Sequence, residues 1–293
     1  MTRKEIRLSI TGRCNNRCFY CCGEGGDFGD ITIQQTDELA ELFVSLKMPH
    51  VHLTGGEPTL RDDLGHIIKA LKTAGIEDIG LTTNGSRLSE NLLDGLIESG
   101  LNELHIHFPS LNKDTYIETT KRDRDPLHIV NLAEYASRVI PVVLNVPVTT
   151  VNLADIGGIL DYCSVHNSLQ VALIEVVSLD RRRKTDKKII MKLFENWAGS
   201  HDYEEETNPN EFGIQYKIRE TGQGIRIVFS NPECAKTLKN REYQCRVRDE
   251  EHRIWVGAFA EGYLCTDCMY RCPEEVSLDG IRERIIGKYG MVL

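Results

Sequence analysis

The sequence predicts an α/β fold in which an open, partial (β/α)6 barrel is followed by a small β-hairpin and cysteine-rich module. Two observations predict this fold. Strand-like and helix-like segments alternate through about the first two thirds of the 293 residues, which is the pattern of repeated βα units. Near residue 177 the pattern changes to a charged stretch, and several of the ten cysteines follow it. A chain of this length suits one large domain, or one domain with an appendage.

Hydrophobic periodicity predicts the elements of the barrel. The first strand covers residues 6–10 and the first helix residues 34–47, where Leu39, Leu42 and Phe43 recur at helical spacing. Six parallel strands with intervening helices would form the open barrel. The other predicted elements are a strand at residues 51–53, a helix at 62–72, and strands at 79–83, 104–108, 142–148 and 171–177.

The later part of the chain predicts a second module. An amphipathic stretch at residues 189–197 precedes a polar segment, residues 201–210, which predicts a loop or linker. We therefore place a domain boundary here. The barrel would cover residues 1–199 and the second domain residues 200–293.

Composition and charge restrict the partners of the protein. The net charge of −9 argues against broad nucleic-acid binding, which needs a basic footprint, and is compatible with a cationic substrate. No apolar run is long enough to span a bilayer, and the charged opening Met1-Thr2-Arg3-Lys4-Glu5 does not resemble a signal peptide. We expect a cytoplasmic protein that binds neither nucleic acid nor membranes. In that compartment, ten cysteines favour metal ligation or redox chemistry over disulfides.

Three cysteines near the N-terminus form the most informative motif. They lie in the run Cys14-Asn15-Asn16-Arg17-Cys18-Phe19-Tyr20-Cys21, directly after the first predicted strand. Thiolates this close in one loop suit a soft metal centre. Four cysteines are typical of zinc or of a completely ligated iron–sulfur cube, whereas three ligands on a cube leave one iron open to a small molecule. A zinc knuckle is the main alternative.

This motif, with the aromatic Tyr20 before its last cysteine, resembles that of the radical S-adenosylmethionine (radical SAM) superfamily. The resemblance implies a TIM-like partial barrel as the core fold. It also implies that Cys14, Cys18 and Cys21 bind a [4Fe–4S] cluster whose open iron binds SAM. One electron, from a flavodoxin- or ferredoxin-type donor, would split SAM into methionine and a 5′-deoxyadenosyl radical. The non-enzymatic alternative is an iron–sulfur or zinc protein that senses redox state or binds a partner.

Two further segments match the same superfamily in order. The run Thr54-Gly55-Gly56-Glu57-Pro58 ends the second strand and resembles its Gly-Gly-Glu-Pro signature. By resemblance, these residues would bind SAM, with Gly55, Gly56 and Glu57 holding its methionyl ammonium group. The third strand ends in Thr82-Thr83-Asn84-Gly85, similar to the molybdopterin-pathway GTP cyclase branch. Its polar tip, Thr83 and Asn84, follows a strand C-terminus, where barrel side chains face the active site.

Four other polar side chains are candidates for the same site. Ser110 follows the fourth strand and Asn145 lies in the fifth, and either could contact the ribose or carboxylate of SAM. A turn or a buried structural role is the alternative for both. His105 and His107 alternate along the fourth strand, so both could point into the barrel as bases or as structural side chains.

The C-terminal module carries five cysteines that we expect to bind a second cluster. Residues 253–259 and 263–265 predict a β-hairpin around a Glu261-Gly262 turn, with cysteines before and after the turn. This arrangement resembles the twitch or shortened SPASM extension of many radical SAM enzymes, which carries an auxiliary [4Fe–4S] cluster. Structural zinc is the alternative. Four of five candidates would suffice: Cys234, Cys245, Cys265, Cys268 and Cys272.

The fifth cysteine indicates a reaction. If the last three cysteines are ligands, Cys245 or Cys234 is spare and can return a hydrogen atom to a substrate radical. We therefore expect epimerisation of a carbon in a small, cationic, aminoglycoside- or sugar-like natural product. The chain begins at its first strand, so we expect no leader-peptide-binding domain. Dehydrogenation of an alcohol and peptide epimerisation are alternatives.

GTP-cyclase-like chemistry is a further alternative, from which the sequence departs in two places. Ten residues separate Cys234 from Cys245, where the branch has paired close cysteines before its arginines. The chain also ends in Gly290-Met291-Val292-Leu293, without the terminal Gly-Gly of the branch.

Overall fold

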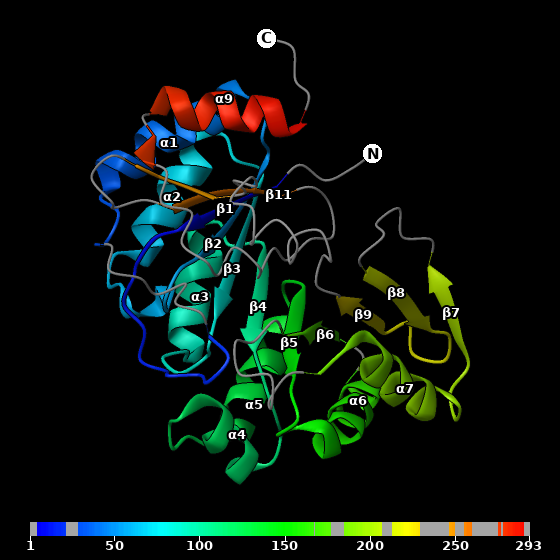
Figure 1. The fold of residues 1–293 in the computed structure, drawn as a ribbon. Coiled ribbons are helices and arrows are strands. Elements are labelled where there is room, and N and C mark those ends of the chain that lie inside the picture. The colour runs from blue at the N-terminus through cyan, green and yellow to red at the C-terminus, as the bar shows by residue number, and fades with distance from the viewer. Residues whose placement is uncertain are drawn as a thin grey trace.

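The computed structural model describes residues 5–21, 29–166, 168–176, 185–206, 213–228, 246–249, 255–259, 275–276 and 278–289. Its centre is a curved sheet whose first six strands along the chain are parallel neighbours, in sequence order (Figure 1). The predicted α/β fold with six parallel strands is confirmed, and the strands that the structure describes form an open sheet. These strands are β1 (Glu5–Ser9), β2 (His50–Thr54), β3 (Asp78–Thr83), β4 (Glu103–His107), β5 (Val142–Val148) and β6 (Leu169–Glu175).

Helices connect these strands and follow the outer side of the curved sheet (Figure 1). Their ends match local signals: Thr32 and Gln35 form a capping box at the first helix, and glycines in the left-handed region end the second and third. The helices are α1 (Ile33–Ser45), α2 (Leu64–Ala74), α3 (Glu90–Ser99), α4 (Lys113–Thr120), α5 (Pro126–Ser137), α6 (Ile156–Val165) and α7 (Lys187–Ala198), with short 3-10 turns η1 (Pro58–Leu60) and η2 (Leu153–Asp155).

Side chains alternate between the two faces of the sheet. Ile6, Leu8, Val51 and Leu53 are fully buried in the core that the helices cover. The alternate residues therefore point to the opposite face, which we call the inner face. Seven of its polar members are discussed below: Arg7, His52, Thr82, Glu103, His105, His107 and Asn145.

Strands from the later part of the chain extend both edges of this sheet. At one edge, β9 (Gly224–Val228) pairs in parallel with β6, followed by antiparallel β8 (Gly213–Ile218) and β7 (Tyr203–Glu206). At the other edge, β11 (Trp255–Phe259) pairs antiparallel with β1. The remaining elements are β10 (Arg246–Asp249), β12 (Glu275–Val276) and α9 (Leu278–Tyr289), which contacts β11 and β12. The boundary between residues 199 and 200 stays a prediction.

The structure corrects the loop predicted at residues 201–210, because Tyr203–Glu206 forms strand β7. This strand has β8 as its neighbour and ends the sheet, and an edge strand tolerates a run of glutamates that a central strand does not. The structure describes only the first of the two strands of the predicted hairpin. That strand, β11, pairs with β10 and β1, whereas residues 263–265 lie outside the described residues. None of the described helices is long and apolar enough to cross a membrane.

Candidate metal centre

The three N-terminal cysteines lie in the loop that leaves the C-terminal end of β1. Cys14 and Cys21 are exposed and Cys18 is partly buried. Burial raises the pKa of the Cys18 thiol to about 12, and the charges of Cys21 and Cys14 act in the same direction. The three sulfur atoms are therefore near enough to influence one another electrostatically, as ligands of one metal centre must be.

Backbone hydrogen bonds hold this cysteine loop against helix α4. The amides of Arg17 and Phe19 donate to the carbonyls of Thr120 and Thr119, at 3.0 and 3.3 Å. Within the loop, the amide of Cys21 donates to the carbonyl of Cys18 at 3.0 Å. The backbone of the loop is thus tied to α4, and Cys14 and Cys21 stay exposed.

The Gly-Gly-Glu segment after β2 is clasped to the same loop. The amides of Gly56 and Glu57 donate to the carbonyls of Thr11 and Arg13, both at 2.7 Å. Gly55 has φ +136°, and a Cβ on Gly56 would lie 2.1 Å from the Arg13 carbonyl oxygen. Only glycine permits this approach, so the two glycines place the segment beside the cysteines.

The carboxylate of Glu57 is fully buried and accepts four hydrogen bonds from the protein. Its Oε1 accepts from the amide and hydroxyl of Thr59 and from the hydroxyl of Thr83, and its Oε2 accepts from the amide of Asn84 at 2.6 Å. Burial raises the pKa of Glu57, and these donors oppose that rise. The structure therefore places this side chain in a tie between β2 and β3, and its contact with the ammonium group of SAM stays a prediction.

Thr83 and Asn84 connect the end of β3 to the cysteine loop. Asn84 Nδ2 donates to Asn15 Oδ1 at 2.9 Å, and Asn15 Nδ2 donates to Ser86 Oγ at the same distance. The structure thus brings the predicted β3 tip beside the predicted metal ligands.

Pro58 occupies the first position of η1, where its fixed φ suits a helix start.

Tyr20 and His107 form a contact on the inner face. The Tyr20 hydroxyl hydrogen-bonds to Nε2 of His107 at the end of β4. Burial lowers the pKa of His107 to about 4, so the imidazole is neutral at pH 7 and Nε2 can accept the tyrosine proton. The tyrosine that precedes Cys21 is thereby oriented by a strand residue 87 positions away.

Ser110 and Asn145 lie in different surroundings. Ser110 is fully buried, donates to Asp155 Oδ2 at 2.6 Å and accepts from the amide of Asn112, so its hydroxyl is engaged within the protein. Asn145 is on the inner face, and its Nδ2 lies 3.5 Å from His105 Nδ1. Contacts of either residue with SAM stay predictions.

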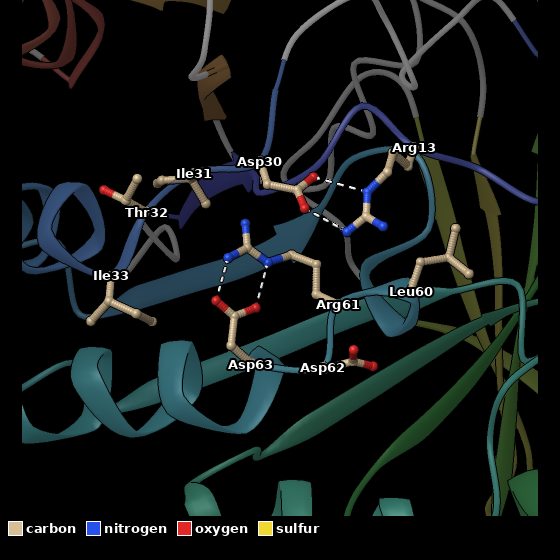
Figure 2. Close-up of a pocket in the computed structure, with 9 residues that line it drawn as sticks. All are labelled: Arg13, Asp30, Ile31, Thr32, Ile33, Leu60, Arg61, Asp62 and Asp63. Atoms are coloured by element: carbon tan, nitrogen blue, oxygen red, sulfur yellow. Dashed lines mark hydrogen bonds and ion pairs between the residues drawn. The ribbon is translucent and has the colours of Figure 1, made fainter.

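Sequence reasoning missed a polar pocket lined by Arg13 and by residues 30–33 and 60–63 (Figure 2). It has a volume of about 520 Å³. Arg13 pairs with Asp30 through Nη2 and Oδ2 at 2.5 Å, and Arg61 pairs with Asp63 through Nη2 and Oδ2 at 2.6 Å. Arg61 also donates to the Ile10 carbonyl at 2.8 Å. These ion pairs stabilise the loops that follow β1 and β2. The Arg61-Asp62-Asp63 run after η1 is the feature of the sequence that could have indicated the second pair.

The donor set fits an iron–sulfur cluster. Cys14, Cys18 and Cys21 supply three thiol groups from one loop, and three thiolates on a cube bind three different irons and leave the fourth iron open.

The cysteines predicted to bind a second cluster cannot be placed. Cys234, Cys245, Cys265, Cys268 and Cys272 all lie outside the described residues. Of the other cysteines, Cys163 is fully buried in α6, as expected for a small core residue.

Comparison with known proteins adds a family to this geometry. The radical SAM superfamily profile matches residues 8–163. A Methanocaldococcus jannaschii protein named probable GTP 3′,8-cyclase is 32% identical over 186 residues, 62% of this chain and 61% of that protein. A Methanococcus aeolicus protein of the same name is 30% identical over 242 residues, 78% of this chain and 77% of its own length. The first match therefore spans about three fifths of the relative.

Solved structures agree in fold. Streptococcus suis SuiB bound to S-adenosylmethionine matches with a TM-score of 0.56 and 18% identity, covering 67% of this chain and 44% of that chain. Methylornithine synthase matches with a TM-score of 0.52 and 14% identity, covering 64% of this chain and 61% of that one. At these identities the likeness concerns the fold alone.

Proposed function

This chain belongs to the radical SAM superfamily, and on that premise we propose that it abstracts a ribose hydrogen from a purine nucleotide and closes a ring onto the base. The observation that carries the proposal is the similarity to relatives named GTP 3′,8-cyclase, one of which matches 78% of this chain. The similarity favours this alternative over the epimerisation that the cysteine count suggested. No comparison reported above supports a cationic natural product as the substrate.

The residues near the exit of β1 fit the cofactors that the superfamily implies. Cys14, Cys18 and Cys21 would hold a [4Fe–4S] cluster, which when bound with SAM supplies the 5′-deoxyadenosyl radical. Because the Glu57 carboxylate is buried and engaged, the backbone carbonyls of Gly55 and Gly56 are the better acceptors for a methionyl ammonium group. Tyr20, held by His107, would shield the same region from the inner face.

The inner face suits an anionic, hydrogen-bonding substrate. Arg7 is buried opposite His52 in the register of β1 and β2, and His105 and Asn145 continue this polar surface across β4 and β5. Nucleotide phosphates and base edges are ligands that guanidinium, imidazole and amide groups bind.

We also propose an auxiliary cluster, for which the support is the spacing of the C-terminal cysteines in the sequence. Four of Cys234, Cys245, Cys265, Cys268 and Cys272 would supply its ligands. In a cyclase it would contact the substrate or carry electrons, and no thiol hydrogen donor is required.

The test is anaerobic turnover with GTP deuterated at C3′. We expect an isomer of GTP whose C8 proton signal moves from the aromatic to the aliphatic region, with deuterium in the 5′-deoxyadenosine released. The C3′–C8 bond forms while C8 keeps its proton, and one electron from the reductant and one proton from solvent replace the hydrogen that was abstracted. The Cys14/Cys18/Cys21→Ala variant should form neither product. Release of 5′-deoxyadenosine while GTP and other purine nucleotides stay unchanged would overturn the nucleotide proposal and leave radical SAM chemistry intact. An inverted carbon with solvent deuterium in another substrate would restore epimerisation.

A further inference from the structure

Three metal-ligating side chains converge on the inner face, away from the cysteine loop. They are His52 on β2 and Glu103 and His105 on β4, and their ligand atoms all lie within 4.8 Å of one another. Two imidazoles and one carboxylate form a donor set that suits first-row divalent ions. We propose that these three residues bind one such ion, Zn²⁺ being the probe of choice.

Strand pairing explains how residues so distant in sequence meet. His52 is opposite Gly80 on β3, and Gly80 is opposite Glu103 on β4. A Cβ on Gly80 would lie 2.3 Å from His52 Nδ1, so the imidazole occupies the space that glycine leaves above β3. Across this gap the rings of His52 and His105 reach a centroid separation of 4.7 Å.

The distances fit ligands of a shared ion. His105 Nε2 lies 3.1 Å from Glu103 Oε1. Two ligands at about 2.1 Å from one metal are about 3.0 Å apart at a right angle and about 3.4 Å apart in a tetrahedron. Although buried, Nε2 makes no hydrogen bond among the described residues, so the contact lacks hydrogen-bond geometry.

Neighbouring polar groups orient the two imidazole rings, as hydrogen-bond partners of metal-ligating histidines do. His52 Nε2 lies 2.7 Å from Thr82 Oγ1, and this contact holds the ring in place. If Nε2–H donates to that hydroxyl, the tautomer is the one in which Nδ1 carries the lone pair. Asn145 faces His105 Nδ1, and its buried Oδ1 makes no hydrogen bond among the described residues. Rotation of the amide would let Oδ1 accept from Nδ1–H, leaving the Nε2 lone pair for the metal.

Burial and charge distinguish this site from exposed acidic clusters. His52 is 4% exposed, and the side chains of His105 and Glu103 are 12% and 20% exposed. Arg7 is opposite His52 in the register of β1 and β2, and Glu103 supplies the negative charge of the three-residue set. The competing explanation is a plain ion pair between Glu103 and protonated His105, which needs no metal and gives no role to His52.

The experiment measures zinc retained by the anaerobically reconstituted protein. Wild type, Glu103→Gln, His105→Gln and His50→Gln are incubated with ZnCl₂, gel-filtered and analysed for zinc and iron per chain. His50 is the matched control, because it lies on the same strand and contacts its own carboxylate, Asp78, at 2.8 Å outside the site. We expect wild type and His50→Gln to retain one zinc more than the other two variants, with equal iron in all four.

Equal zinc in all four proteins would overturn the proposal, because zinc held by cysteines is insensitive to these substitutions. If the two site variants lose iron or their circular dichroism, zinc K-edge absorption of the wild type decides. A first shell with nitrogen, oxygen and imidazole scattering supports the site, and an all-sulfur shell excludes it. Asn145→Ala should weaken zinc binding about tenfold. None of these outcomes depends on turnover of GTP.

Discussion

Arg61 shows how a single buried charge can join two loops of the site. Its side chain is 4% exposed, donates to the Ile10 carbonyl, and forms two parallel hydrogen bonds with Asp63 (Figure 2). The hydrogen bond from Arg61 is the main cause that lowers the pKa of Asp63. A buried guanidinium needs such a partner, because removing it leaves an uncompensated charge.

Asp63→Asn should therefore lower the free energy of unfolding at pH 7 by about 1 kcal/mol, a value reduced because the carboxylate is partly exposed. The pKa of Asp63 is lower in the folded than in the unfolded chain, so the pair stabilises above the unfolded value and its contribution is lost as the pH falls through the folded value. The difference from wild type should shrink between pH 7 and pH 3 in urea unfolding. Both proteins would carry Cys14/Cys18/Cys21→Ala, so that acid destroys no N-terminal cluster.

Asp62→Asn is the control for this experiment. Asp62 is the exposed neighbour of Asp63 on the same turn, so its substitution should change stability by less than about 0.5 kcal/mol at either pH. A constant difference between wild type and Asp63→Asn across the pH range would contradict the role assigned to the ion pair.

At the scale of elements, two close backbone contacts between loops determine where the site forms. The Gly-Gly-Glu segment approaches the cysteine loop through the amides of Gly56 and Glu57, and neither contact involves a side chain. The close approach of these two loops depends on the absence of a Cβ at Gly56. No other residue can therefore occupy this position without moving the backbone.

Gly56→Ala should destabilise the protein by about 1–3 kcal/mol, because its Cβ meets backbone that has to move. We expect iron content after reconstitution to fall with it, since this close approach positions the loop that carries the cysteines. The matched control is Gly95→Ala in α3, which meets nothing within 4 Å. It should stabilise by about 0.5–1 kcal/mol and leave iron unchanged. Thermal unfolding and iron analysis of both variants provide the measurement, and a Gly56→Ala protein like wild type in both would refute the role assigned to the close approach.

At the scale of the whole molecule, the sheet joins segments from both ends of the chain. Strand β1, which leads into the cysteine loop, lies between β2 and the C-terminal β11. The opposite edge is extended by β9, β8 and β7. Strand β11 therefore links the later part of the chain directly to the strand that leads into the cysteine loop.

Iron analysis tests the two-cluster organisation. We expect about eight irons per reconstituted wild-type chain and about four in Cys14/Cys18/Cys21→Ala, because each cube contains four. The reduced variant should keep the electron paramagnetic resonance signal of the second cluster. A variant with no iron would mean that Cys234, Cys245, Cys265, Cys268 and Cys272 bind zinc or no metal. Zinc analysis of the same samples distinguishes those two outcomes.

The sequence by itself determined the order of βα units, the spacing of Cys14, Cys18 and Cys21, and the polar ends of β2 and β3. These are local properties, since periodicity, turn residues and ligand spacing act within a few positions along the chain. The same local signals failed at Tyr203–Glu206, where a polar strand at the sheet edge looks like a loop.

Only the tertiary structure decided which side chains become neighbours. Glu57 is tied to Thr83 and Asn84, and His52 reaches His105 across Gly80, because parallel strands set a register between residues far apart in sequence. A shift of one residue in that register would turn each side chain to the opposite face. The register is fixed by burial of the helix-covered face as a whole, which no single stretch of sequence encodes.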